Sequence, residues 1–567
     1  MEASVLGPVG YEMRLEKLKE DLGTDEELGS IRRERHEERN SRPGREYCLL
    51  RIFFQYSHRA KRARSMSSLA THTLYSPSGR WLYNDAEQRT ARYTPFDVDA
   101  LQEIASKAVD ARHCTAFTKI AEGSYNKIFL LEFDNASRAV ARIPSSIELD
   151  SHFAPKVLAW NSSSSNPVAS PFILMEYLSN PPLQSCWYHI KGAQTGYVIS
   201  DICWLQYLFT LRKFSQIGSL YFKEDVSPEL QDRPLYLSDE DNQRPSAQKY
   251  RIGPIVDREW WRGERRNIQA DRGPWPDMAS YITTAARLAQ ECLSRGIDTN
   301  SSFARSSHQD VPEIHRLLEK CIAVAPHLAP PDSSLLSPLL AHPDMSASNM
   351  LIESPEKPSI ACFLDWQGAI VAPAFMQVSI PALLAYTDGV FELDSEGCVP
   401  PLPEDIDERP SDEQEYLRLH HKLLSRYRFY LAQLPKLGPL HAAAWRYPHQ
   451  EVTSDLPLYV LRCWADGPLK LRDALMEVSD PDSSAIPCAI DFSPAEREAH
   501  DEELRARVRY QGMVERLVEY VGCDGQGWVE EERFEEAQRA VEGAARQWDD
   551  AVGPFPFRDG SWSFFLN

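Results

Sequence analysis

The chain has 567 residues, with 62 Lys and Arg against 83 Asp and Glu, which gives a formal net charge of −21. At about 100–200 residues per domain, this length predicts several packing units around a substantial core. Hydrophobic residues make up 43% and aromatic residues 10% of the chain, which excludes a wholly disordered protein. The negative charge argues against a nucleic-acid scaffold, because such proteins bind by neutralising phosphates. The composition favours a soluble enzyme with no nucleic-acid partner.

The cysteines and the apolar segments indicate where the protein resides. The 11 cysteines are scattered from Cys48 to Cys523 without a C-x-x-C pair, which predicts free thiols in a reducing compartment. The start, MEASVLGPVGYEMRLEKLKEDLG, lacks the apolar core of a signal peptide. No uninterrupted apolar run approaches the roughly 18–20 residues of a membrane span. The best candidate, Ile360 to Tyr386, carries Asp365 and is broken by prolines, so we expect an intracellular protein without a membrane span.

The N-terminal part divides into two stretches of contrasting charge. Residues 1–47 hold 12 Asp and Glu and 9 Lys and Arg, which predicts a disordered or frayed helical extension. From Cys48 to Asn84 there is no acidic residue but there are six basic ones, with many Ser and Thr. This is the composition of a mitochondrial presequence, although presequences lie at the extreme N-terminus. Translation that begins near Met66 would reconcile this composition with its position in the chain; otherwise the stretch is a basic linker. We predict a mitochondrial protein, with a cytoplasmic one as the alternative.

Hydrophobic periodicity predicts the order of the elements from about residue 94 onward. An amphipathic helix is expected first, at Phe96–Val109. The expected strands are Phe117–Ile120, Lys127–Phe133, Ala139–Ile143 and Phe172–Leu178. The second and third of these are expected to form a hairpin through the turn Asp134–Ser137. The helices expected next are Ile202–Phe214, Met278–Gly296 and Pro312–Ala325, with two or three more in the charged tail from Pro494. This order predicts an α+β fold with a small β-rich lobe followed by a larger helical lobe.

The sharpest candidate site begins at Ala341, in the sequence AHPDMSASNMLI. There His342, Asp344 and Asn349 fit the pattern H-x-D-x-x-x-x-N. A short strand, a Pro-containing turn and a second strand then lead to Asp365, so a hairpin would bring Asp365 beside Asn349. Phosphoryl transfer needs this set of groups. One carboxylate positions and deprotonates the attacking hydroxyl, while a second carboxylate and an Asn carbonyl hold Mg²⁺.

The same residues also have a structural interpretation. Asp344 would then cap a turn, Asn349 would fill a loop bend and Asp365 would end a strand. Zinc is not expected, because His342 has no second His or Cys at ligand spacing. The strand–turn–strand–Asp sequence that follows the motif favours phosphoryl transfer over the structural interpretation.

The small lobe offers possible partners for phosphates. Gly123 and Ser124 lie between two β-rich runs, where the backbone N–H groups of a turn could face phosphates, although an ordinary hairpin turn is commoner. The next strand ends in AVARIP, which places Arg142 where a kinase-like fold has its phosphate-pairing Lys. Arg has a permanent charge and a bidentate fork, so it can form the same ion pair with a different reach.

Several segments, in order, resemble the aminoglycoside phosphotransferase or choline kinase-like branch of the protein kinase fold. They are AEGSYNKIFLL, VARIP, KVLAWNSSSSNPVASPFILMEY, FSQIGSLYF, DRGPW, AHPDMSASNMLI and FLDWQGA. More narrowly, the chain resembles the altered inheritance of mitochondria protein 9 group, which carries a segment similar to SGRWLYND at Ser78–Asp85. The resemblance covers roughly Tyr75 to the C-terminus.

The resemblance implies a kinase that uses ATP and Mg²⁺ to phosphorylate a hydroxyl of a small molecule. It implies that Asp344 is the catalytic base, in a catalytic motif that includes His342, and that Asn349 and Asp365 are the Mg²⁺ ligands. The implied nucleotide contacts are Arg142, the phosphate loop of Gly123 and Ser124, and the adenine-binding backbone from Glu176 to Leu178. The run Arg272–Trp275 is a marker of the family, for which we expect a structural role as a turn.

One departure from the family concerns the partner of Arg142. In the kinase fold, a helix after this strand supplies a Glu that pairs with the basic residue. Here only Ser145–Ala154 separates Pro144 from Pro155, too little for a helix of about 10–12 residues and its connections. Glu148 is the nearby carboxylate of the right type. Either the helix has been lost or an exon is missing from this sequence.

Three functions stay open at this point: a small-molecule kinase, a pseudo-kinase that binds nucleotide or a protein partner without turnover, and a scaffold built on the charged tail. The pseudo-kinase could have a role in mitochondrial maintenance. The sequence names neither the acceptor nor the oligomeric state. The expected division is an extension at 1–74, the small lobe at 75–180, the helical lobe at 181–490 and a helical tail at 491–567 packed on it.

Overall fold

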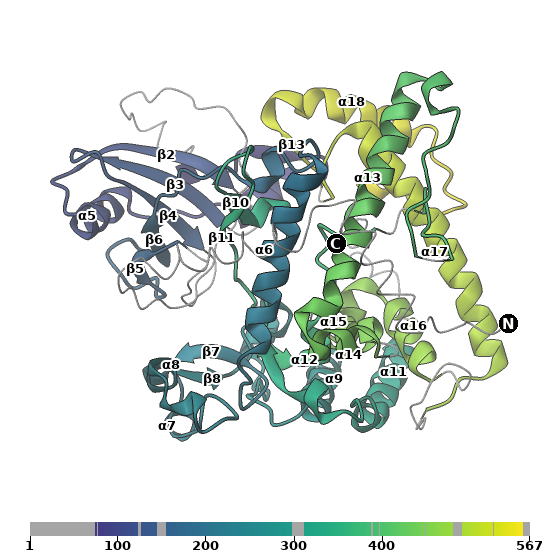
Figure 1. The fold of residues 1–567 in the computed structure, drawn as a ribbon, viewed down its shortest axis with the longest axis horizontal. Helices are drawn as coiled ribbons and strands as arrows, with labels where there is room; N and C mark the ends of the chain where they lie inside the picture. The colour runs from purple at the N-terminus through teal and green to yellow at the C-terminus, as the bar shows by residue number, and fades with distance from the viewer. Residues whose placement is uncertain are drawn as a thin grey trace.

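The computed structural model confirms the predicted α+β arrangement of two lobes (Figure 1). It describes residues 74–75, 77–122, 126–144, 155–297, 311–386, 389–395, 397–447, 450–479, 490–525 and 527–558. Residues 1–73 of the predicted extension lie outside these ranges, as do Gly123, Ser124 and Glu148. A small sheet lobe lies beside a larger helical lobe, and the tail packs along the helical lobe (Figure 1).

The small lobe is built on a five-stranded antiparallel sheet with the strand order β2-β3-β4-β6-β5. Its strands are β2 (Cys114–Glu122), β3 (Asn126–Phe133), β4 (Arg138–Pro144), β5 (Val157–Asn161) and β6 (Phe172–Glu176). The predicted hairpin is confirmed, because β3 pairs with β4 and the N–H of Phe133 donates to the carbonyl of Ser137 across the turn. The strand β5 was not predicted.

The predicted amphipathic helix is confirmed as α5 (Val98–Ala108). Asp97 caps its N-terminus by accepting a hydrogen bond from the N–H of Ala100 at 2.8 Å, which satisfies one of the open N–H groups of the first turn. Its apolar face packs with side chains of the sheet in one buried cluster, which includes Leu101, Ala105, Phe129, Leu131, Ala141 and Leu174. Burial of this face contributes more to the stability of the helix than its intrinsic propensity does.

The helical lobe is formed around one large apolar core. Four helices supply most of it: α9 (Met278–Ser294), α11 (Val311–Val324), α15 (Gln450–Asp466) and α16 (Leu469–Val478). The helices α9 and α11 confirm the predicted ones. A second core lies between α6 (Gly192–Thr210) and α13 (Ser411–Gln433). The helix α6 begins well before the predicted start at Ile202 and ends at Thr210 rather than at Phe214.

Smaller elements complete this lobe. Two of them are the short helices α12 (Ala374–Gln377) and α14 (Pro439–Trp445). The strands β9 (Pro338–Leu340) and β12 (Val371–Pro373) form an antiparallel pair. The strands β7 (Ser219–Phe222) and β8 (Tyr250–Gly253) form a hairpin, which is flanked by α7 (Pro228–Gln231) and α8 (Pro245–Lys249). The hairpin of β7 and β8 projects below the sheet lobe in Figure 1.

The run Arg272–Trp275 supports the base of this projection. The buried guanidinium of Arg272 donates to the carbonyls of Arg265 at 2.6 Å and Ile268 at 3.0 Å. Trp275 and Ile217 exchange backbone hydrogen bonds of 2.9 and 2.8 Å. These contacts give the run the structural role expected from the sequence.

The tail contains two helices, as predicted, and one strand. These are α17 (Pro494–Val521), β13 (Trp528–Glu530) and α18 (Phe534–Ala545). A capping box of Ser493 and Glu496 begins α17. The strand β13 pairs antiparallel with β1 (Gly79–Trp81), which is followed by α4 (Asp85–Ala91). The segment that precedes the five-stranded sheet is therefore also held by the distant tail.

Two expectations about the whole chain can be compared with the described residues. Within them, no helix combines the length and the apolar character needed to cross a membrane. The cysteines in these ranges are free thiols, and most of them are buried, as predicted.

Arg80 connects β1 to the tail and provides a test of this pairing. Its guanidinium donates to the carboxylate of Asp85 at 3.0 and 2.9 Å and lies 3.7 Å from the ring centre of Phe534 in α18. We expect Arg80→Ala to remove both contacts and to increase local opening of the β1–β13 pair by roughly tenfold. Hydrogen exchange of peptides from β1 and β13, followed by mass spectrometry, measures this opening.

The matched control is Lys107→Ala, which removes an exposed ion pair with Glu103 in α5. We expect no change in the β1 and β13 peptides of this variant, because exposed pairs contribute little. Equal exchange in Arg80→Ala and the unsubstituted protein would contradict the role given to Arg80.

Candidate active site

The predicted hairpin after the H-x-D-x-x-x-x-N motif is present. Its strands β10 (Met350–Ile352) and β11 (Ile360–Phe363) pair antiparallel, with Met350 opposite Phe363. One residue further on, the N–H of Leu364 donates to the carbonyl of Asn349 at 2.7 Å. Asp365 follows Leu364 directly, so the structure brings Asp365 and Asn349 together at the end of the hairpin, as predicted.

The loop of residues 341–349, the candidate catalytic loop, is fixed by His342. Its Nδ1 accepts a hydrogen bond from the N–H of Asp344 at 3.1 Å, and its Nε2 lies 2.8 Å from the carbonyl oxygen of Leu364. This pattern corresponds to a neutral imidazole that carries its proton on Nε2 and donates to Leu364. The ring also lies edge-on to Trp366, with 4.5 Å between ring centres. His342 therefore joins the loop to the strand end that carries Asp365.

Asp344 is half-buried and has one anchored carboxylate oxygen. Its Oδ2 accepts from Nδ2 of Asn349 at 2.8 Å and from Oγ of Ser346 at 3.3 Å. The backbone N–H of Ser346 also bonds to the carboxylate. Burial raises the pKa of Asp344 above its ordinary value, although the bonds from Ser346 and Asn349 act in the opposite direction. These bonds fix the orientation of the carboxylate.

Asn349 and Asp365 provide oxygen atoms suited to a cation. Asn349 is completely buried, and within the described part of the chain its Oδ1 has no hydrogen-bond partner. Such buried oxygens are normally satisfied, so this one is an acceptor that a bound cation would satisfy. Asp365 is 2% exposed and has a φ of 60°, a conformation that favours glycine and is strained for Asp. An amide and a carboxylate oxygen are ligands that Mg²⁺ accepts.

The described residues contain no group of three or more His, Cys, Asp or Glu side chains that could hold a metal ion. A Mg²⁺ ion at Asn349 and Asp365 would therefore need further ligands from water or phosphate. This is how Mg²⁺ usually binds at phosphoryl-transfer sites. The donor set fits such a shared ion.

Arg142 is completely buried in β4, and its Nη2 donates to Oε1 of Gln367 at 2.5 Å. This contact joins the sheet lobe to the segment just after Asp365. The sequence predicts a carboxylate partner in a following helix rather than this contact with Gln367. The available signal was the polar Gln367 two positions after Asp365 in FLDWQGA. Glu148, the carboxylate considered there, lies outside the described residues.

The connection between the lobes lies beside an apolar cluster. The cluster joins strands of the sheet to the β10–β11 hairpin and comprises Ile128, Val140, Ile173, Met175, Leu351, Cys362 and Leu364. Tyr177 and Leu178 pack against it. The carboxylate of Glu176 accepts from the N–H of Lys156 at 2.9 Å, so this side chain supports the pairing of β5 with β6. The predicted adenine-binding segment, Glu176 to Leu178, thus borders an apolar surface shared by both lobes.

The flank of the predicted phosphate loop is anchored although Gly123 and Ser124 themselves lie outside the described residues. Glu122, the last residue of β2, accepts hydrogen bonds from Lys119 at 2.6 Å and from the N–H of Ser78 at 2.8 Å, and it pairs with Lys127 at 2.9 Å. The SGRWLYND segment therefore reaches the residue immediately before the loop.

Gln367 offers a test of the contact between the lobes. We expect Gln367→Leu to leave the buried guanidinium of Arg142 with one acceptor fewer, which lowers the free energy of unfolding by about 1–3 kcal/mol. Thermal unfolding followed by fluorescence measures this change. The matched control is Gln184→Leu at an exposed position, with an expected effect within about 0.5 kcal/mol. Equal midpoints for the two variants would contradict a stabilising contact at Gln367.

No family model matches the chain. A subtelomeric hrmA-associated cluster protein of Aspergillus fumigatus is 28% identical over 493 residues, which cover 76% of this chain and 92% of that protein. The mitochondrial altered inheritance of mitochondria protein 9 of Clavispora lusitaniae is 25% identical over 460 residues, covering 68% and 74% of the two chains.

A search of solved structures also finds proteins that match parts of this chain. A thermostable mutant of aminoglycoside phosphotransferase APH(4)-Ia, in complex with AMP-PNP and hygromycin B, matches with a TM-score of 0.32 and 11% identity, covering 67% of this chain and 98% of its own. The sequence relatives confirm the resemblance to the altered inheritance of mitochondria protein 9 group, and their names agree with the predicted mitochondrial localisation. The chain is a homologue of proteins named altered inheritance of mitochondria protein 9 and has an α+β fold of two lobes.

Proposed function

We propose that this protein is a small-molecule kinase in which Asp344 is the catalytic base. The observation that carries the proposal is the arrangement around Asn349. Its Nδ2 anchors Asp344, its backbone carbonyl anchors Leu364 beside Asp365, and its Oδ1 has no partner among the described residues. Phosphoryl transfer depends mainly on positioning and electrostatics, and one residue here orients the groups for both tasks.

In the proposed reaction, Oδ1 of Asp344 accepts the proton of an acceptor hydroxyl. The acceptor oxygen forms its bond to the γ-phosphorus of ATP as the bond to ADP breaks. The raised pKa of Asp344 suits this role, because a carboxylate with a higher pKa is a stronger base. His342 is a positioning residue in this proposal, since both of its ring nitrogens already bond to the backbone.

The nucleotide occupies the space between the lobes in this proposal. The base lies against the apolar cluster near Leu178, with the backbone from Glu176 to Leu178 as its hydrogen-bonding edge. Arg142 contacts the phosphates together with the loop of Gly123 and Ser124. Asn349 and Asp365 hold Mg²⁺, which neutralises phosphate charge when bound.

We also propose that the protein acts in mitochondria, as its relatives are named to do. A second candidate is a pseudo-kinase that binds nucleotide or a protein partner without turnover and serves mitochondrial maintenance. The observation in its favour is that the bond from Arg142 to Gln367 holds the two lobes together whether or not turnover occurs. Turnover separates the two candidates.

The central test is Asp344→Asn. We expect this variant to lower turnover by roughly 10²–10⁴-fold, because the base is lost while the shape of the side chain is kept. Purified protein with Mg²⁺, labelled ATP and a library of hydroxylated metabolites provides the turnover assay. The matched control is Asp239→Asn at an exposed position, which should retain full activity. If the folded protein binds an ATP analogue but phosphorylates no compound in the library, the result would favour the pseudo-kinase.

Binding of the nucleotide tests the metal ligands separately. Calorimetry with AMP-PNP is expected to show that Asp365→Asn weakens binding in Mg²⁺ but not in its absence. Asp344→Asn should bind AMP-PNP as tightly as the unsubstituted protein. Equal weakening of Asp365→Asn with and without Mg²⁺ would contradict a metal-binding role.

The pH dependence tests the environment of Asp344. Since the carboxylate form is the active one, activity falls as the pH falls through the pKa of Asp344, and burial places this fall above the ordinary range of Asp. Ser346→Ala removes a bond that lowers the pKa, so we expect the acidic limb of kcat/KM to move to higher pH. Ser354→Ala, in the turn of the hairpin, is the control and should leave the profile in place. An unmoved limb in Ser346→Ala would rule out Asp344 as the group that titrates.

A further inference from the structure

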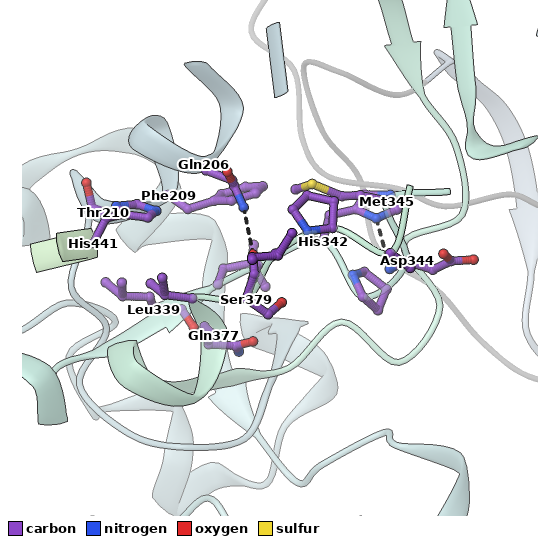
Figure 2. A pocket seen from close by; sticks show the side chains of 17 residues that line it. Gln206, Phe209, Thr210, Leu339, His342, Asp344, Met345, Gln377, Ser379 and His441 are labelled. Carbon is purple, nitrogen blue, oxygen red and sulfur yellow. Dashed lines mark hydrogen bonds between the residues drawn. The ribbon is translucent and has the colours of Figure 1, made fainter. Parts of the chain in front are cut away.

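A pocket of about 240 Å³ lies in the helical lobe, next to the candidate catalytic loop (Figure 2). Four segments form its walls: the end of α6, residues 339–345, residues 377–382 after α12, and His441 of α14. Among the residues that line it, Asp344 is the single charged side chain, and none is Lys, Arg or Glu. Figure 2 shows the carboxylate of Asp344 directed away from the end of the pocket where Thr210 and His441 lie. The interior therefore presents no charged group.

His441 is the distinctive polar group of this pocket. Its side chain is 2% exposed, and within the described residues neither ring nitrogen has a hydrogen-bond partner. Burial lowers the pKa of His441 to about 4, so the imidazole is neutral at physiological pH. A neutral imidazole offers one donor and one acceptor, and buried groups of this kind are normally satisfied. The ring therefore presents unused hydrogen-bonding capacity toward the pocket.

Three other polar side chains in the walls, those of Gln206, Gln377 and Thr210, already bond within the protein, and Ser379 is exposed. Gln206 donates to the carbonyl of Ser379 at 3.2 Å and accepts from the hydroxyl of Tyr430 at 2.9 Å. Gln377 donates to the carbonyl of Ile370 at 2.7 Å, and Thr210 donates to that of Tyr207 at 2.7 Å. These bonds hold the walls in place. The remaining side chains are mostly apolar and include Phe209, Leu339, Leu340, Val378 and Ile380.

We propose that this pocket binds an uncharged, mainly apolar small molecule whose hydroxyl group hydrogen-bonds to His441. A hydroxyl both donates and accepts, so it can bond to Nε2 in either tautomer of the ring, and the apolar side chains of the walls favour a hydrocarbon body. The molecule would contact residues 342–345 of the candidate catalytic loop from the side opposite the carboxylate of Asp344. The site is thus separate from the acceptor position facing Oδ1 of Asp344, and its existence does not depend on kinase activity.

The probe for the test is phenol, compared with toluene, which lacks the hydroxyl, and benzoate, which carries a charge. Ligand-observed NMR on the full-length protein, without nucleotide, measures their dissociation constants. We expect phenol to bind in the millimolar range and at least about tenfold more tightly than either analogue. No binding of phenol, or equal binding of phenol and toluene, would overturn the proposal.

Two substitutions locate the site. His441→Phe keeps a ring but removes both nitrogens, and it should weaken phenol binding by about tenfold while toluene still binds. Ala382→Phe places a bulky side chain at an exposed rim position and should exclude both compounds without disturbing the core. Unchanged phenol binding in both variants would overturn the assignment.

Two controls separate this site from its surroundings. His189→Phe changes an exposed histidine outside the pocket and should not alter phenol binding. Asp344→Asn should bind phenol normally, because the carboxylate points away from the inner end of the pocket. Loss of phenol binding in Asp344→Asn would move the site to the carboxylate and overturn the proposal. A failure of the kinase assays alone would leave these measurements unaffected.

Discussion

The candidate site depends on the backbone of a single residue, Leu364. Its N–H donates to the carbonyl of Asn349 at 2.7 Å, and its carbonyl oxygen lies 2.8 Å from Nε2 of His342. Both partners belong to the candidate catalytic loop, so the loop and the strand that leads to Asp365 are joined by two bonds at one peptide position. Backbone groups buried here must be satisfied, and these bonds satisfy both groups of Leu364. The relative position of Asp344 and Asp365 follows from this connection.

The contact of Arg142 with Gln367 extends the same arrangement to the sheet lobe. It joins β4 to the segment directly after Asp365, so the basic residue of one lobe is placed by the candidate metal loop of the other. A carboxylate at this position would neutralise the guanidinium, whereas the amide of Gln367 orients it without cancelling its charge.

Local sequence signals predicted the parts of this fold that local interactions form. The amphipathic period identified α5 and α9, and the turn residues identified the hairpin of β3 and β4. The start of α6 was missed because this helix is apolar around much of its circumference, which leaves no polar face to mark where it begins. The β10–β11 hairpin was predictable because a short turn fixes which strand ends meet. The pairing of β1 with β13 and the role of Gln367 were not, because their partners are remote in the sequence.

The charged tail is part of this body rather than a separate scaffold. Its apolar side chains, including Tyr510, Val514, Leu517 and Val529, form a buried cluster against which Leu82 and Tyr83 pack. The segment that carries Ser78 and Arg80 links this cluster to the small lobe. Arg80 contacts Phe534 of α18, and the N–H of Ser78 donates to Glu122, which immediately precedes Gly123. A displacement of the tail would therefore shift the residues that flank the predicted phosphate loop. The many carboxylates of the tail remain at the surface, where they favour solubility, while its apolar faces help to hold the segment that precedes the sheet.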